Sequence, residues 1–151
     1  MNIKKYIPSA VITAIFIACL FTEKIGVGDN HSIVIQATAY HFYHANIFHF
    51  LLNIIALWTF HPRWKTVVVA FIASSVVAAL PFASLDTPTY GLSGMIFAAY
   101  ARKFATWRLS VKWILLSNIA LMFIPHVNVR IHLMAFGTSY IYWYLWKLMK
   151  S

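Results

Sequence analysis

The chain has 151 residues, of which 62% are apolar and only 10% are charged, and its formal net charge is +9. A soluble domain is about half apolar and about a quarter charged, so this composition argues against an ordinary soluble fold and against a disordered chain. It predicts an integral membrane protein. The single cysteine, Cys19, excludes an internal disulfide bond and a metal site built from several cysteines.

Apolar segments follow one another along the chain, separated by proline, polar or charged residues. They cover residues 6–21, 44–60, 66–85, 90–101 (running on toward residue 107), 109–124 and 129–146. A hydrocarbon core about 30 Å thick is crossed by about 20 residues of helix, and we interpret each segment as one span. The predicted fold class is therefore an all-α polytopic membrane protein, a single domain of six transmembrane helices over residues 1–151.

The basic residues predict the direction of these spans. If the N-terminus is cytoplasmic, ten of the 12 Lys and Arg residues fall on the inner side: Lys4, Lys5, Arg63, Lys65, Arg102, Lys103, Arg108, Lys112, Lys147 and Lys150. The outer side receives Lys24, Arg130 and all 3 acidic residues. This positive-inside distribution predicts a multi-pass protein of the cell membrane with both termini cytoplasmic. Topology and anionic lipid headgroups then account for the net charge without nucleic-acid binding.

The N-terminus leaves a second interpretation open. Lys4 and Lys5, followed by an apolar run that ends at Cys19, are also typical of a cleaved secretory or lipoprotein signal. We favour a first span, because Phe16 is unusual three residues before such a cysteine. Loss of this span would also break the alternation of charge between the two sides.

Strongly polar side chains inside apolar spans are candidates for function, because burying them in lipid is costly. His49 and Asn53 lie four residues apart and share one face of the second predicted helix. Ser93 stands near the start of the fourth span, and His132 stands near the start of the last. At a rise of ~1.5 Å per residue, all four lie about 15 to 22 Å from the inner charged boundary. We therefore expect them to meet in a hydrated pocket that opens to the outer side.

Ser93 and His132 form the smallest nucleophile–base pair, because imidazole can take the hydroxyl proton and return it to a leaving group. A carboxylate as third member is not expected, since all 3 acidic residues fall in predicted outer loops. The sequence thus predicts a Ser–His dyad. Candidate donors to an oxyanion are the side chains of His49 and Asn53 and the backbone N–H of Ser93 at a helix N-terminus.

Taken in order, these residues form a pattern that extends over nearly the whole chain. It comprises His44-x-x-x-x-His49-x-x-x-Asn53, then Gly91-x-Ser93-Gly94, then His132 at the outer start of the last span. The pattern, on spans in this order and direction, resembles the rhomboid family of intramembrane serine proteases. The resemblance implies a minimal six-span rhomboid-like bundle.

The resemblance also implies a role for each polar residue. Ser93 would attack the peptide bond and His132 would act as the base. His49 and Asn53 would line the oxyanion hole, and His44 would support the polar pocket. The implied substrate is a single-span transmembrane protein that enters from the lipid bilayer and is cut in or near its membrane segment, and no cofactor is implied.

The chain departs from the family pattern in two places. Ile131, Ala135 and Ser139 stand where the family has an alanine and two glycines on the last span, so we expect a looser approach of base and nucleophile. The loop over residues 22–41 lacks the Trp-Arg pair of many bacterial members.

Two other functions remain open. One is a catalytically inactive rhomboid-like protein that binds membrane clients. The other is a membrane carrier whose metal or haem is held by histidines of the outer side, namely His41, His44, His49, His126 and His132. The second function leaves the Gly91–Gly94 pattern unexplained. Structural roles are also open, since Ser93 could be a helix cap and His49 and Asn53 could join helices.

Overall fold

The computed structural model describes residues 3–83, 88–107, 116 and 127–150. Within them the chain is helical apart from turns, loops and an isolated bridge that pairs Val27 with Thr89. The α-helices are α1 (Ile7–Cys19), α2 (Ile33–Ala39), α3 (Ile47–Phe60), α4 (Trp64–Ala78), α5 (Ser93–Trp107) and α7 (Val129–Leu148). Short 3₁₀ turns are η1 (Ile3–Lys5), η2 (Tyr40–Phe42) and η3 (Pro81–Ala83).

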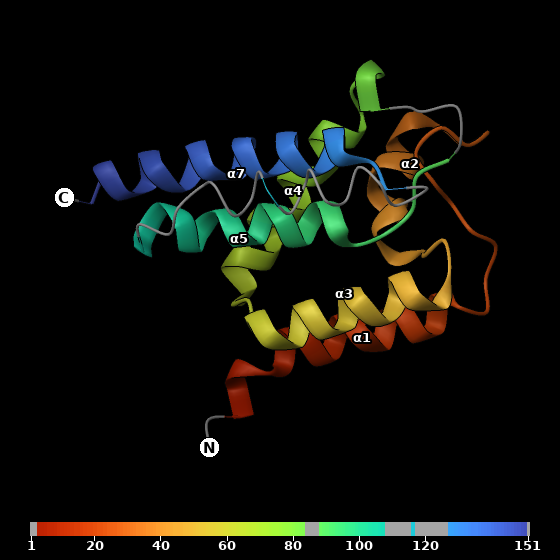
Figure 1. Cartoon of the computed structure of the whole chain (residues 1–151), viewed down its shortest axis with the longest axis horizontal. Coiled ribbons are helices and arrows are strands. Elements are labelled where there is room, and N and C mark those ends of the chain that lie inside the picture. The colour runs from red at the N-terminus through yellow and green to blue at the C-terminus, as the bar shows by residue number, and fades with distance from the viewer. Residues whose placement is uncertain (1–2, 84–87, 108–115, 117–126, 151) are drawn as a thin grey trace.

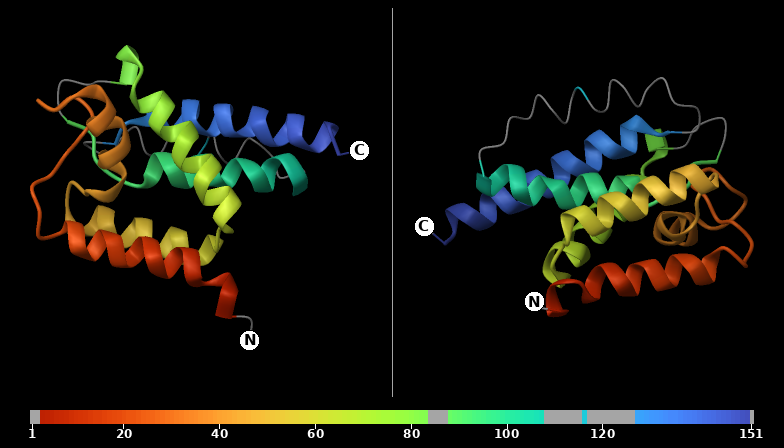
Figure 2. Two further views of the ribbon diagram at one scale, coloured as in Figure 1. Left: turned by 180° about the vertical axis from the view of Figure 1, so that it is seen from behind. Right: turned by 60° about the horizontal axis from the view of Figure 1, so that its bottom comes forward.

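The helices are arranged around α5, as Figure 1 shows. α5 and α7 lie side by side, and α4 crosses both and packs against each. α1 and α3 form a second, antiparallel pair on another side of α5 (Figure 2), and α2 packs against α4 at one end of the molecule. The ends of α3, α5 and α7 therefore lie toward one pole, and the starts of these helices lie toward the other (Figure 1).

Small side chains allow the close packing of α5 and α7. Ala98 of α5 and Ala135 and Ser139 of α7 are all fully buried. At Gly94, a Cβ atom would lie 2.8 Å from Cγ2 of Ile131, which is closer than van der Waals contact allows. The absence of a side chain at Gly94 thus lets the start of α5 approach the start of α7.

Asparagine side chains begin the two helices that carry the predicted histidines. At the start of α3, Asn46 Oδ1 accepts the backbone N–H of His49 at 2.9 Å. At the start of α7, Asn128 Oδ1 accepts a backbone N–H at 3.3 Å, and its Nδ2 donates to the carbonyl of Ala83 at 2.8 Å. These caps satisfy N–H groups that have no partner inside the helix. They also fix His49 and His132 in the first turns of their helices.

The predicted bundle of six transmembrane helices is wrong, because none of the described helices is both long and apolar enough to cross a membrane. α1, α3, α4 and α5 have 13, 14, 15 and 15 residues. A span needs about 20 residues to cross a core of ~30 Å. α7 has 20 residues, but Arg130, His132 and several hydroxyl side chains lower its hydropathy.

The predicted cellular location rested on the same six spans and is wrong for the same reason. The prediction was an integral, multi-pass protein of the cell membrane with cytoplasmic termini and a site that opens to the outer side. The predicted segments nevertheless coincide in position with helices, since α1, α3, α4, α5 and α7 each overlap one segment. The remaining segment, 109–124, lies outside the described residues except for Leu116.

Replacing Asn128 by alanine should lower the free energy of unfolding by about 2 kcal/mol, because it removes a cap and leaves the buried carbonyl of Ala83 without its donor. The matched variant Asn46→Ala removes a cap at an exposed position and should cost about 1 kcal/mol or less. Denaturation in urea measures both values. Equal losses in the two variants would contradict the buried role of Asn128.

Candidate functional site

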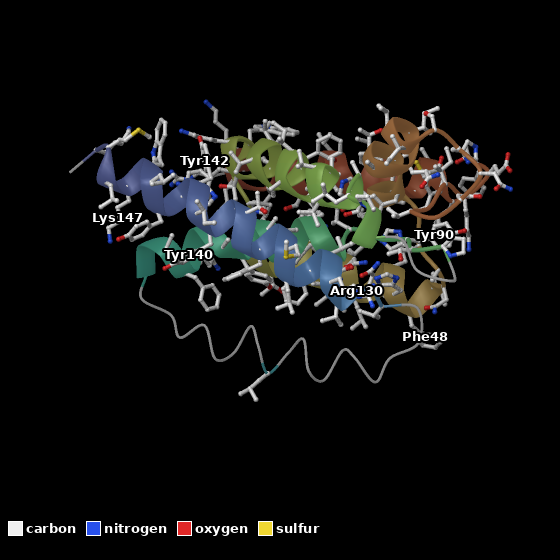
Figure 3. The ribbon with its side chains drawn as sticks, turned by 90° about the horizontal axis from the view of Figure 1, so that it is seen from above. Phe48, Tyr90, Arg130, Tyr140, Tyr142 and Lys147 are labelled. Atoms are coloured by element: carbon white, nitrogen blue, oxygen red, sulfur yellow. The ribbon has the colours of Figure 1, made fainter. Side chains whose placement is uncertain are left out.

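Ser93 and His132 are in direct contact, although they are 39 positions apart in the sequence. Ser93 is the first residue of α5, and His132 stands in the first turn of α7. The Oγ atom of Ser93 lies 2.7 Å from Nε2 of His132, which is a hydrogen-bond distance. Figure 3 shows Tyr90 and Arg130, which lie near them in the sequence, toward the same end of the molecule. The structure therefore brings the two predicted catalytic residues together.

The imidazole of His132 is enclosed by its neighbours. It is only 2% exposed, and its ring stacks on Phe97 with 4.6 Å between the centroids. Burial, and then the charge of His49, lower the pKa of His132 to about 3. The ring is therefore neutral near pH 7, so that Nε2 can accept the Ser93 proton. Nδ1 has no hydrogen-bond partner within the described part of the chain, which leaves a dyad there.

The backbone before Ser93 is held in place by Gly91. Its φ of 121° is a left-handed conformation that L side chains rarely adopt. Its N–H donates to the carbonyl of Tyr40 at 2.9 Å. A Cβ atom at this position would also collide with the imidazole of His49, approaching Nε2 to 2.9 Å. A glycine is thus required here by both the backbone conformation and the close approach of His49.

His49, one of the predicted supporting residues, lies against the turn that leads to Ser93. Its ring rests on Gly91, two residues before Ser93, and its charge affects the pKa of both His44 and His132. Burial lowers its own pKa. His49 is only partly buried, whereas His132 is enclosed.

Asn53 and His44 are more deeply buried than His49. Asn53 is 5% exposed and lies one turn after His49 on α3, and its Nδ2 has no partner within the described residues. The ring of His44 contacts those of Phe16 and His49, with centroid distances of 5.0 and 5.5 Å. Neither ring nitrogen of His44 has a hydrogen-bond partner in the described residues. His44 is thus linked to the site through its ring contact with His49.

Tyr40 supports the nucleophile, a role that no motif in the sequence indicated. Its carbonyl accepts the N–H of Gly91, and its hydroxyl would lie 2.9 Å from a Cβ atom at Gly94. This fully buried residue therefore contacts both glycines that flank Ser93. The available signal was its position four residues before His44, in a segment rich in histidine and aromatic residues.

A second Ser–His contact lies between η2 and α4. Nε2 of His41 is 3.0 Å from Oγ of Ser75 and 3.5 Å from Oγ of Ser74, and the ring is fully buried. Ser75 stands inside α4, where the backbone N–H groups are used by the helix itself. Ser93 differs because the first N–H groups of a helix have no partner inside it and can face a ligand. The Ser75 pair therefore lacks the backbone donors that the Ser93 pair has.

The departures from the rhomboid pattern do not separate the pair. Ile131 and Ala135 are buried against α5, and Ser139 is fully buried one turn further on. The looser approach expected from these residues is not observed, since Ser93 and His132 are 2.7 Å apart.

The proposed metal-binding or haem-binding histidines that the structure describes form no metal-binding group. Within the described residues, no group of three or more His, Cys, Asp or Glu side chains could hold a metal ion. His41 contacts Ser75, and His126 lies outside the described residues.

The fold and the site thus define a helical protein with one Ser–His pair at a helix N-terminus. No family model and no curated protein matches the sequence in comparison.

The buried histidines should make the protein sensitive to acid. Burial is the main cause that lowers the pKa of His41, His44 and His132 to about 3, whereas each titrates near 6.5 when unfolded. The unfolded state therefore binds more protons between these values. The stability from this difference is complete above pH ~6.5 and is lost as the pH falls toward 3.

Urea denaturation at a series of pH values measures this effect. The dependence of the unfolding free energy on pH should approach an uptake of about three protons per chain on unfolding. The variant His41→Gln should reduce this uptake by about one proton. A free energy of unfolding that stays constant from pH ~7 to ~4.5 would contradict the burial of these rings.

Proposed function

We propose that the chain is a serine-type peptide hydrolase in which Ser93 is the nucleophile and His132 is the base. One observation carries this proposal, namely the 2.7 Å contact between Ser93 Oγ and His132 Nε2 at the N-terminus of α5. Ser93 is half-buried, which gives a substrate access to a hydroxyl whose partner is enclosed.

The proposed reaction has two steps. Ser93 attacks the peptide carbonyl while its proton moves to Nε2 of His132, and the resulting imidazolium gives that proton to the leaving amine. This leaves an acyl ester on Ser93. Water then attacks the ester, His132 takes a proton from the water, and the same proton returns to the departing Oγ of Ser93. The products are a carboxylic acid, an amine and the unchanged pair.

The negative charge on the tetrahedral intermediate needs donors that are already oriented. The backbone N–H of Ser93 supplies one, because it belongs to the first turn of α5 and shares the positive end of the helix dipole. His49 supplies a second, since its ring lies against Gly91. Asn53 remains a proposed contributor on the same face of α3.

The resemblance to rhomboid proteases supports a peptide bond as the target, and a single-span membrane protein as the substrate. We propose this reaction and this substrate class without the membrane-spanning fold, which the helix lengths contradict. The inactive, client-binding alternative has one observation in its favour. Nδ1 of His132 has no partner in the described residues, so that nothing there orients or stabilises an imidazolium.

A fluorophosphonate probe should label the purified protein at Ser93, because only an activated serine reacts quickly with it. Ser93→Ala should abolish labelling, and His132→Ala should slow it by about 100-fold or more. Mass spectrometry of the labelled peptide identifies the site. Ser75→Ala is the matched control, since it removes the serine of the other Ser–His contact and should leave labelling unchanged.

The same variants should be tested for cleavage of a single-span reporter protein, which distinguishes a peptidase from another serine hydrolase. Labelling that persists in Ser93→Ala would refute the proposed nucleophile. A folded wild-type protein that is neither labelled nor active would favour the client-binding alternative. One bound metal ion per purified chain, together with full reporter cleavage by the Ser93→Ala variant, would favour the metal or haem carrier.

A further inference from the structure

A cavity lies far from the Ser–His pair, where α3 ends and α4 begins. It has a volume of about 780 Å³, and its wall includes Lys4, Lys5, His61, Arg63 and Lys103. We call it the basic cavity. A smaller hollow of about 340 Å³ shares His61, Arg63 and Lys103 with it and adds Arg102. His49 stands in the first turn of α3 and the cavity adjoins its last turn, so that ~18 Å of helix separates the two sites.

The wall of the basic cavity carries charge of one sign. No Asp or Glu is among the described residues that line it or the smaller hollow. Glu23 and Asp29, the acidic residues in the described part of the chain, lie beyond the far end of α1 and before α2 (Figure 1). The positive charges therefore add to one another inside a hollow, where low-dielectric walls concentrate their field.

The pKa values of neighbouring groups are lowered first by burial and second by these charges. Burial, followed by the charges of Lys5 and Lys103, lowers the pKa of His61. Burial, followed by the charge of Arg63, lowers the pKa of Arg102. Each additional positive charge is thus disfavoured here, and a bound anion would relieve the repulsion.

The backbone around the cavity is also unusual. His61 has a φ of 47°, and it is the one described non-glycine residue with positive φ. Its ring contacts the edge of Tyr6 at 4.6 Å, which ties η1 to the end of α3. Arg63 then begins α4 as its N-cap, and the cavity wall continues with Trp64 in the first turn. The unpaired N–H groups of this turn add to the attraction for an anion.

We propose that the basic cavity binds the phosphate group of an anionic ligand. Lysine and arginine side chains are the usual partners of phosphate, and Lys4, Lys5 and Arg63 line the hollow from two separate elements. The volume exceeds that of inorganic phosphate and lies in the ordinary range of small-molecule sites, ~300–1,000 Å³. A phosphate that carries an organic group fits this size. Such a group occurs both in soluble phosphorylated molecules and in phospholipid headgroups.

Two probes distinguish these sources. Isothermal titration with glycerol phosphate measures binding of a soluble ligand. Co-sedimentation with phosphatidylcholine vesicles that contain phosphatidylglycerol, compared with phosphatidylcholine alone, measures binding of a headgroup. Binding of either probe supports the proposal and identifies the source, whereas binding of neither refutes it.

The test variant is Lys5→Gln/Arg63→Gln, which removes two exposed charges from the cavity wall. It should weaken binding by at least about tenfold, because two charge-assisted hydrogen bonds are lost. The matched control is Lys147→Gln/Lys150→Gln, which removes two charges in and just after the last turn of α7. This helix ends toward the same pole as α3 (Figure 1), and neither lysine lines the cavity. It should change binding by less than about threefold. Equal weakening in both variants would show attraction by net charge alone and would overturn the proposal.

A second readout does not depend on the variants. If glycerol phosphate occupies the basic cavity, NMR titration of the His61 ring should show its pKa rising on binding, since the anion offsets the field of Lys5 and Lys103. An unchanged His61 pKa at saturating ligand would place the ligand elsewhere and refute the site. Fluorophosphonate labelling at Ser93 should be the same in both double variants. A failure of anion binding would therefore leave the proposed hydrolase standing, and a failure of labelling would leave the anion site standing.

Discussion

The close approach of α5 to α7 is the contact on which the candidate site depends. Ser93 begins one helix and lies 2.7 Å from a histidine in the first turn of the other. This distance is possible because Gly94 leaves no side chain between the helix starts, and Ala98 and Ala135 are buried further along. The helix starts are so closely packed that a single methyl group added at Gly94 would collide with both Ile131 and the hydroxyl of Tyr40.

The same packing determines the protonation of the base. His132 lies against the face of Phe97 and is almost fully buried, so that its charged form is disfavoured. A neutral imidazole is ready to accept a proton, and enclosure then raises the free energy of the imidazolium that forms. The Ser93 contact, the helix dipole of α5 and a developing oxyanion nearby are the groups that can offset this cost. Burial thus prepares the base and at the same time makes the protein less stable in acid.

The sequence located the helices and the Ser–His pair better than it predicted the lengths of the helices. Apolar runs showed where helices form, but Asn46 caps α3 and delays its start to Ile47, although the apolar run begins at residue 44. α4 ends at Ala78, although its apolar run continues to residue 85. The apolar excess appears instead as exposed side chains on the helix surfaces, for example Phe48 at 75% and Leu52 at 62% exposure on α3. Tyr40 was missed because its role arises from contacts with residues 51 and 54 positions away, which no local pattern encodes.

Several basic residues of the described chain gather around the basic cavity. Like charges gathered around one hollow repel one another and destabilise the folded state. The residues of the basic cavity come from η1, from the turn after α3 and from α5, so that folding itself brings them together. Arg102 and Thr66 show how such a cost is reduced locally, since the guanidinium donates to the hydroxyl at 2.7 Å. A bound anion would reduce the repulsion among the exposed lysines of η1 in the same way, because it can accept charge-assisted hydrogen bonds from them. The basic cavity at the start of α4 is where such an anion would bind.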